Sequence, residues 1–128
     1  MTHPIPATEK QMFSTVTEDG GLELALRELP VPQPNGDEVL IRVEATPINP
    51  SDLAVMLSVA DSNAFTALGY GARAEIPEAL RRHVAPRVGK ALPIGNEGAG
   101  TVVAAGDDPA AQALIGKTVA AAGGGFYT

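Results

Sequence analysis

Glycine and proline interrupt this sequence so often that it can fold only into short elements joined by turns. The 128 residues include 14 glycines and 11 prolines. Proline ends a helix because it lacks a backbone donor, and both residue types mark turns. These breakers exclude a helix bundle and favour a set of short strands. Hydrophobic residues make up 45% of the chain and aromatic residues only 4%, so we expect one domain with an aliphatic core.

The acidic charge and the absence of cysteine narrow the classes of function. The net charge is -6, and the longest basic run is Arg81-Arg82, which is too short to bind nucleic acid or an anionic membrane. Disulfides, thiolate metal sites and a catalytic thiol all require cysteine. Met1–Lys10 lacks the apolar region of a signal peptide, and no apolar stretch reaches the ~18 residues of a membrane span. We therefore expect a cytoplasmic protein with neither nucleic acid nor membrane as partner.

Alternation of apolar and polar residues predicts the strands. Gly20-Gly21 separates the first two strands and indicates a hairpin. In the second strand, Leu22, Leu24 and Leu26 are expected to share one half-buried face. The predicted strands are Met12–Val16, Leu22–Leu26, Val39–Ala45, Thr101–Ala105 and Thr118–Ala122.

The segments after the hairpin predict a linker and a first short helix. Pro30, Pro32 and Pro34 enforce an extended linker, which Asn35-Gly36 closes with a turn. Ser51 or Asp52 would then cap a helix that ends at Leu57, since a short side-chain oxygen satisfies a free N–H there.

The middle of the chain is the least regular part. We interpret Asp61–Lys90 as an irregular insertion with one or two helical turns, one of them an amphipathic helix over Pro77–Val84. Its polar face, Arg81, Arg82 and His83 with Arg87 nearby, would be solvated. Ala110–Ile115 predicts one further helical turn. The predicted fold is β-rich α+β and barrel-like, with small helices.

Three segments in this order resemble the medium-chain dehydrogenase/reductase superfamily, in its quinone-oxidoreductase branch. They are Val31–Ala45 (VPQPNGDEVLIRVEA), Ile48–Asp52 (INPSD), and Pro93–Val103 (PIGNEGAGTVV) followed by Gly116–Val119 (GKTV). The resemblance covers about Gln11–Ala60 and Leu92–Thr128. It implies an N-terminal, alcohol dehydrogenase-like GroES domain, which is a partly open β-barrel. We expect this barrel to be incomplete at its C-terminal end.

The resemblance also implies what the domain does. Family members of this branch reduce quinones, enones or other activated carbonyls with hydride from NADPH or NADH, which a Rossmann domain binds. We expect residues 1–128 to form the substrate-side domain of such an NAD(P)H-dependent oxidoreductase, with the Rossmann domain absent from this chain. The isolated chain would then be inactive, and its partners would be the missing domain and a small-molecule substrate. An unfinished barrel edge would also favour a homo-oligomer.

Asn49-Pro50-Ser51-Asp52 is the first candidate site. One reading is an ordinary strand-to-helix turn with a cap. The other, implied by the resemblance, places Asn49 and Ser51 at the cleft as catalytic residues, where an amide and a hydroxyl can stabilise a carbonyl oxygen that gains charge. Asn49 and Pro50 would also contact the cofactor. Further candidates for the substrate cleft are Asp52, Asn96, Glu97 and Tyr127.

A catalytic zinc is not expected. Asn49 and Asn96 stand where zinc-dependent relatives have a cysteine and a histidine, and neutral amides replace those ligands poorly. The two histidines, His3 and His83, lie outside the matching motifs.

The glycine clusters do not form a dinucleotide-binding fingerprint. Gly95–Gly100 has the reverse spacing, and a strand rather than a helix is predicted to follow it, so these glycines would serve a turn and close strand packing. Gly123–Gly125 also lacks a following helix. An alternative function therefore stays open: a non-catalytic GroES-like interaction module, or one part of a split enzyme.

Overall fold

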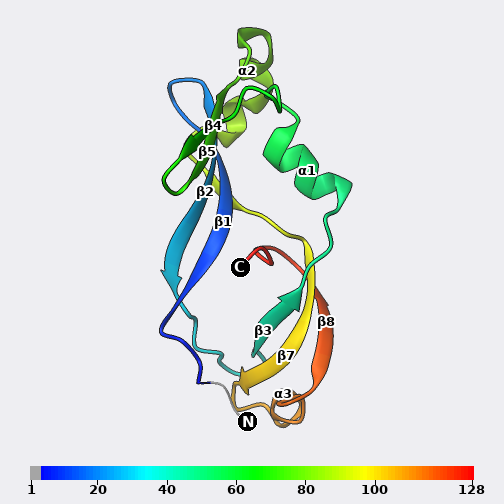
Figure 1. The fold of residues 1–128 in the computed structure, drawn as a ribbon. Coiled ribbons are helices and arrows are strands. Elements are labelled where there is room, and N and C mark those ends of the chain that lie inside the picture. The colour runs from blue at the N-terminus through cyan, green and yellow to red at the C-terminus, as the bar shows by residue number, and fades with distance from the viewer. Residues whose placement is uncertain (1–3) are drawn as a thin grey trace.

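The computed structural model describes residues 4–128, which form two antiparallel sheets and short helices (Figure 1). The larger sheet has the strand order β4-β5-β2-β1-β6, and the smaller has the order β3-β7-β8. The two sheets do not close into a barrel over the described residues. The elements are β1 (Thr8–Val16), β2 (Gly21–Pro30), β3 (Val39–Ala45), α1 (Pro50–Leu57), β4 (Thr66–Leu68), β5 (Gly71–Glu75), α2 (Glu78–Val84), a 3-10 turn (Ala85–Arg87), β6 (Ala91–Pro93), β7 (Glu97–Ala105), α3 (Pro109–Gln112) and β8 (Thr118–Ala122). The β-rich fold class expected from the sequence is confirmed.

The predicted first hairpin is present, with longer strands. β1 pairs with β2 from Thr8↔Pro30 to Val16↔Leu22. The prediction that Leu22, Leu24 and Leu26 share one half-buried face is wrong. Leu22 is fully buried, whereas Leu26 is 47% exposed. Helix α2 and the loop after α1 cover the Leu22 end of the sheet. Leu26 instead lines a groove whose opposite wall includes Val43 and Glu44 of β3.

The segment 61–90 is more regular than predicted. It contains the β4–β5 hairpin, and β5 extends the large sheet by pairing with β2, with Leu22 opposite Ala74. Ile76 and Val84 then complete a buried cluster with Val16 and Leu22. The segment is therefore part of the core, and the predicted helix within it is present as α2.

Arg87 departs from the predicted solvated face. Arg81, Arg82 and His83 are exposed, as expected. The Arg87 guanidinium instead turns inward, where Nη2 donates to Ser14 Oγ at 3.0 Å and to the Val55 carbonyl at 3.2 Å. The cause is the 3-10 turn, which takes Arg87 off the helix that carries the other cations.

In the small sheet, β3 and β8 have the bounds that the sequence predicted, whereas β7 is longer than predicted. β7 begins at Glu97 rather than Thr101, because its glycines lie inside the strand. A side chain at Gly100 would collide with the carbonyl oxygen of Arg42 on β3, so glycine permits the close strand packing that was expected. Gly95, with φ of +95°, makes the turn before the strand.

Helix α1 begins two or three residues earlier than predicted. Its N-cap is Asn49, not Ser51 or Asp52. Asp52 instead occupies the third helical position and accepts a hydrogen bond from the Asn49 backbone N–H at 2.9 Å. The predicted turn at Ala110–Ile115 is present as the shorter α3, capped by Asp108. Among residues 4–128 no helix is long and apolar enough to cross a membrane.

Candidate functional site

Three segments that are distant in the sequence meet beside the first turn of α1. They are the Asn49–Asp52 turn, the start of β7 at Asn96-Glu97, and the C-terminal tail at Tyr127. The turn follows β3 directly, and β3 pairs with β7, so the small sheet brings the first two segments together. The tail follows β8 and returns toward β1 (Figure 1).

Asn49 and Glu97 form the first contact of the site. Asn49 Nδ2 donates to Glu97 Oε2 at 2.9 Å. Glu97 is exposed, so its carboxylate lies at the surface and stays hydrated. Besides the N–H that donates to Glu97, the Asn49 side-chain amide has a second N–H and a carbonyl oxygen. The carboxylate therefore orients the amide without using all of its hydrogen-bonding capacity.

Ser51 and Asn96 form a second contact beside the first. Asn96 Nδ2 donates to Ser51 Oγ at 2.8 Å, and both residues are exposed. Because the Ser51 oxygen accepts this bond, the Ser51 proton remains able to donate. Within residues 4–128 no acceptor for that proton is found. The Asn96 amide thus fixes a hydroxyl whose donor is free.

Asp52 and Tyr127 form the buried side of the site. Asp52 is 2% exposed, and its Oδ2 lies 3.2 Å from the Tyr127 hydroxyl, which is also 3.1 Å from the Pro47 carbonyl. Burial, and then the charge and hydrogen bonding of Asp52, raise the pKa of the Tyr127 phenol above its ordinary value. The Tyr127 proton is therefore held between two acceptors and stays on the phenol at neutral pH.

Helix α1 is anchored at its far end by residues that the sequence did not single out. Ser14, fully buried, donates to the Val55 carbonyl at 2.9 Å, and Arg87 donates to the same oxygen. Burial lowers the pKa of the Arg87 guanidinium, and its Nε is buried without a partner among the described residues. These contacts fix the direction of the helix whose first turn carries Asn49 and Ser51.

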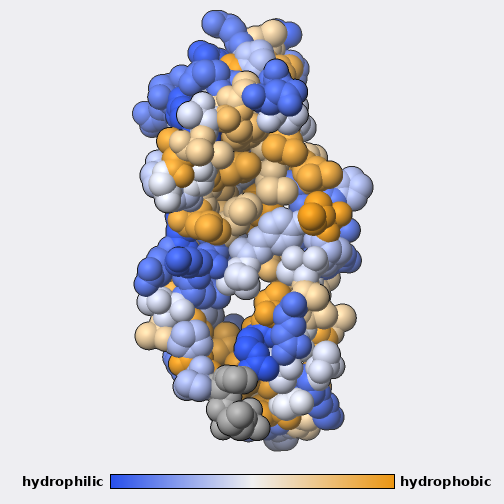
Figure 2. Space-filling model, viewed as in Figure 1, coloured by the Kyte–Doolittle hydropathy of each residue, from blue (hydrophilic) through white to orange (hydrophobic). Residues whose placement is uncertain are grey.

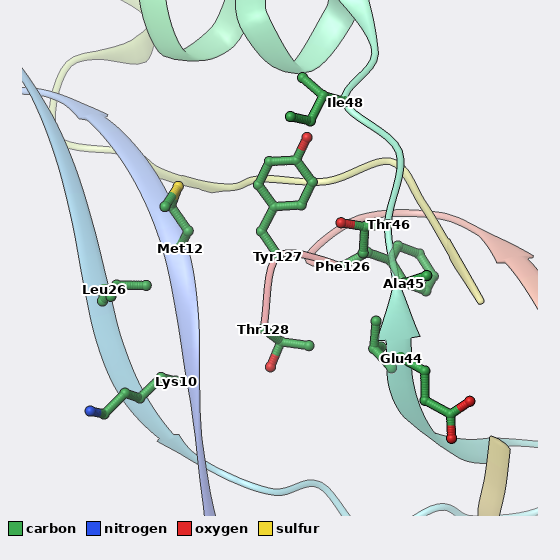
Figure 3. Close-up of a pocket in the computed structure, with 11 residues that line it drawn as sticks. Lys10, Met12, Leu26, Glu44, Ala45, Thr46, Ile48, Phe126, Tyr127 and Thr128 are labelled. Atoms are coloured by element: carbon green, nitrogen blue, oxygen red, sulfur yellow. The ribbon is translucent and has the colours of Figure 1, made fainter. Parts of the chain in front are cut away.

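A groove of about 480 Å³ lies beside the Tyr127 side chain, which forms part of its lining. Figure 3 shows its walls: Lys10, Met12 and Leu26 come from the large sheet, and Glu44 to Ile48 come from β3 and the segment after it. The C-terminal tail, Phe126–Thr128, lies between them. Ile48 is 70% exposed beside the site. Sequence reasoning missed Leu26 because it assigned that residue to a covered face.

The remaining candidates lie as follows. Pro50 is exposed at the first position of α1, next to Asn49. His83 is on α2, away from the three segments of the site, and His3 lies outside the described residues. Over residues 4–128, His, Asp and Glu side chains form no group of three or more that could hold a metal ion. The side-chain amides of Asn49 and Asn96 bond Glu97 and Ser51, respectively.

Comparison with known proteins identifies a matching family model and a similar solved structure. A family model described as the alcohol dehydrogenase GroES-like domain matches residues 35–126. The structure is similar to a crystal structure of a putative NADPH:quinone reductase from Mesorhizobium loti, with a TM-score of 0.54 and 30% sequence identity. The match covers 94% of this chain and 31% of that chain, so this chain spans about a third of that protein's length. No curated protein matches the sequence.

Proposed function

This chain belongs to the alcohol dehydrogenase GroES-like domain family, and on that premise we propose that it forms the substrate-side wall of an NAD(P)H-dependent reductase. The reaction would transfer hydride to a quinone, an enone or another activated carbonyl, without zinc. The membership itself makes the chain an oxidoreductase-related domain of the medium-chain dehydrogenase/reductase superfamily. The similarity to an NADPH:quinone reductase supports the choice of substrate class and of NADPH over NADH.

The observation that carries the proposal is the free donor of Ser51. Hydride arriving at a carbonyl carbon, or at the far carbon of a conjugated system, leaves negative charge on the carbonyl oxygen. A fixed hydroxyl that donates to that oxygen stabilises the charge as it develops. Ser51 is suited to this role because Asn96 occupies its oxygen at 2.8 Å and leaves its proton unused.

Asn49 would supply a second polar contact. Its N–H that does not bind Glu97 can reach either the carbonyl oxygen or the carboxamide of a nicotinamide, with Pro50 beside it. The nicotinamide supplies the hydride when it is bound. The residues of this chain would orient it and the substrate, which is the ordinary division of work between a protein and such a cofactor.

Tyr127 and Asp52 would position the site rather than react. The Tyr127 hydroxyl already bonds two acceptors, and Asp52 is 2% exposed and bonds the helix backbone. A proton needed to complete the reduction would therefore come from water or from a group on the opposite wall of the cleft. We propose that this opposite wall is a Rossmann domain outside the present chain.

The zinc-free form of the proposal rests on donor chemistry. Catalytic zinc is held by thiolate, imidazole or carboxylate groups. Asn49 and Asn96 offer neutral amides, and their N–H groups are already directed at Glu97 and Ser51. The anionic groups nearby are Glu97 and the buried Asp52, whose carboxylate already bonds the Asn49 backbone and Tyr127, and among residues 4–128 no third such side chain joins them to hold zinc. We therefore derive no step through a metal.

A chimera tests the proposal. Residues 1–128 would be joined to the portion of the Mesorhizobium loti protein that this chain does not cover, and NADPH oxidation would be followed with 1,4-benzoquinone. We expect turnover that a zinc chelator leaves unchanged, and no NADPH binding by residues 1–128 alone in calorimetry. A folded chimera that binds NADPH and leaves the quinone unreduced would contradict the proposal and favour a non-catalytic interaction module.

A further inference from the structure

Among residues 4–128, Glu97 is the one charged residue that lines a trough beginning at the candidate site. The trough has a volume of about 610 Å³, and its lining comes from the end of β3, the start of β7 and β8. The rest of the lining is alanine, glycine, threonine and proline. Glu97 joins the trough to the site, because its Oε2 accepts the Asn49 amide at 2.9 Å. A substrate held at Asn49 and Ser51 therefore has room to extend past Glu97.

No positive charge offsets this carboxylate within the site. The segments that form the site and the trough contain no lysine or arginine, and they are residues 45–52, 96–99 and 120–128. Glu97 forms no ion pair with any other residue of the described range 4–128. Lys10 lines the other groove and does not line the trough. The second carboxylate of the site, Asp52, adds further negative charge from its buried position.

Most cations of the chain gather around α2, at one end of the molecule. Five of the nine lysines and arginines lie in or beside β5 and α2, and they are Arg73, Arg81, Arg82, Arg87 and Lys90. The space-filling view shows strongly hydrophilic residues at this end, whereas the visible face of α1 is largely hydrophobic (Figure 2). A negatively charged group that enters the trough would therefore meet a carboxylate and no cation.

We propose that Glu97 selects substrates by charge, so that the site takes neutral quinones or enones and disfavours those that carry a carboxylate, sulfonate or phosphate group. The inference rests on the proposed function and deepens it by narrowing the substrate class. Like charges repel more strongly near a protein surface than in bulk water. A charged group also loses hydration on entering the trough, and no cation there compensates for that loss. A neutral ring incurs neither cost.

The test uses the chimera described above with two quinones that differ by one fixed negative charge, 1,4-naphthoquinone and 1,4-naphthoquinone-2-sulfonate. The quantity compared is the ratio of kcat/KM for the sulfonate to kcat/KM for the neutral quinone. A substitution that affects hydride transfer itself changes both values and cancels in this ratio. The difference in reactivity between the two quinones cancels when the ratio is compared between variants.

Glu97→Gln is the informative variant, because it removes the charge and keeps an oxygen that can accept from the Asn49 amide. We expect the substitution to raise the ratio by about fivefold at low ionic strength, since it removes the repulsion between the carboxylate and the sulfonate. The gain should shrink as salt is added, because salt screens the repulsion between charges near the surface.

Asp107→Asn is the matched control. It removes the same charge from an exposed side chain just after β7, at the opposite end of that strand from Glu97, and should leave the ratio unchanged. An equal rise in both variants would overturn the proposal, because the effect would then come from the net charge. An unchanged ratio in Glu97→Gln would also overturn it, while turnover of the neutral quinone would still support the proposed function. A folded chimera that reduces neither quinone would overturn both.

Discussion

The hydroxyl of Tyr127 lies 3.2 Å from the Oδ2 oxygen of Asp52, a carboxylate that is 2% exposed and that also accepts the Asn49 N–H. This contact links the end of the chain to the first turn of α1. The helix start, the tail and the polar groups of the candidate site are therefore coupled through one buried carboxylate.

Tyr127→Phe removes one hydrogen bond to that carboxylate while keeping the ring. We expect a loss of about 1 kcal/mol in the free energy of unfolding, because the carboxylate retains its bond from the Asn49 backbone. Urea denaturation measures the difference. Tyr70→Phe is the control, since Tyr70 is 54% exposed and its hydroxyl has no partner among the described residues. Equal effects of the two substitutions would show that the Tyr127–Asp52 bond contributes nothing.

The raised pKa of Tyr127 gives a pH dependence with a defined sign. A group whose pKa is higher in the folded state contributes stability that is complete below the unfolded pKa, here about 10. That stability is lost as the pH rises through the folded pKa. The wild-type chain should therefore lose more stability above about pH 10 than Tyr127→Phe does. Unfolding curves across this range test the difference, and parallel losses would contradict it.

Arg87→Ala should destabilise the chain by about 2 kcal/mol. The substitution removes charge-assisted bonds to Ser14 and to the Val55 carbonyl near the end of α1, which lie in a partly buried setting. Arg82→Ala on the exposed side of α2 should change stability by less than about 0.5 kcal/mol. Thermal or urea unfolding of both variants measures these changes in the free energy of unfolding. A neutral Arg87→Ala would mean that Ser14 alone holds the helix end.

Gly100→Ala tests the close packing of β7 on β3. The new Cβ would collide with the Arg42 carbonyl oxygen, which belongs to the paired backbone and cannot swing away. We expect a cost of about 3 kcal/mol. Gly69→Ala has open space around the new methyl group and should lie within about 0.5 kcal/mol of the wild type. Similar stability of the two variants would show that β3 can shift to accept a side chain.

The strands with local signals were predictable. Val39–Ala45 and Thr118–Ala122 have the bounds read from their alternation and flanking turns. The β4–β5 hairpin was missed because its strands are short and its main partner, β2, lies about 50 residues away in the sequence. The glycines inside β7 hid its first four residues, since glycine in a strand gives no apolar alternation.

The candidate site was predictable only in part. The resemblance selected Asn49, Ser51, Asn96 and Glu97, and the structure brings these four into two hydrogen-bonded pairs. It could not reveal which oxygen accepts and which proton stays free. Arg87 was assigned to a solvated face with its neighbours in sequence, because inward rotation by a 3-10 turn has no local signature.

The turnover of Ser51→Ala, in the chimera with the cofactor-binding portion of the related reductase, tests directly whether the Ser51 hydroxyl stabilises the reacting carbonyl. Loss of a donor to the developing oxyanion should lower kcat for quinone reduction by about a hundredfold. Ser62→Ala, an exposed serine in the loop after α1, should leave kcat unchanged. If Ser51→Ala retains the full kcat of a folded chimera, the Asn96–Ser51 pair is not the group that stabilises the reacting carbonyl.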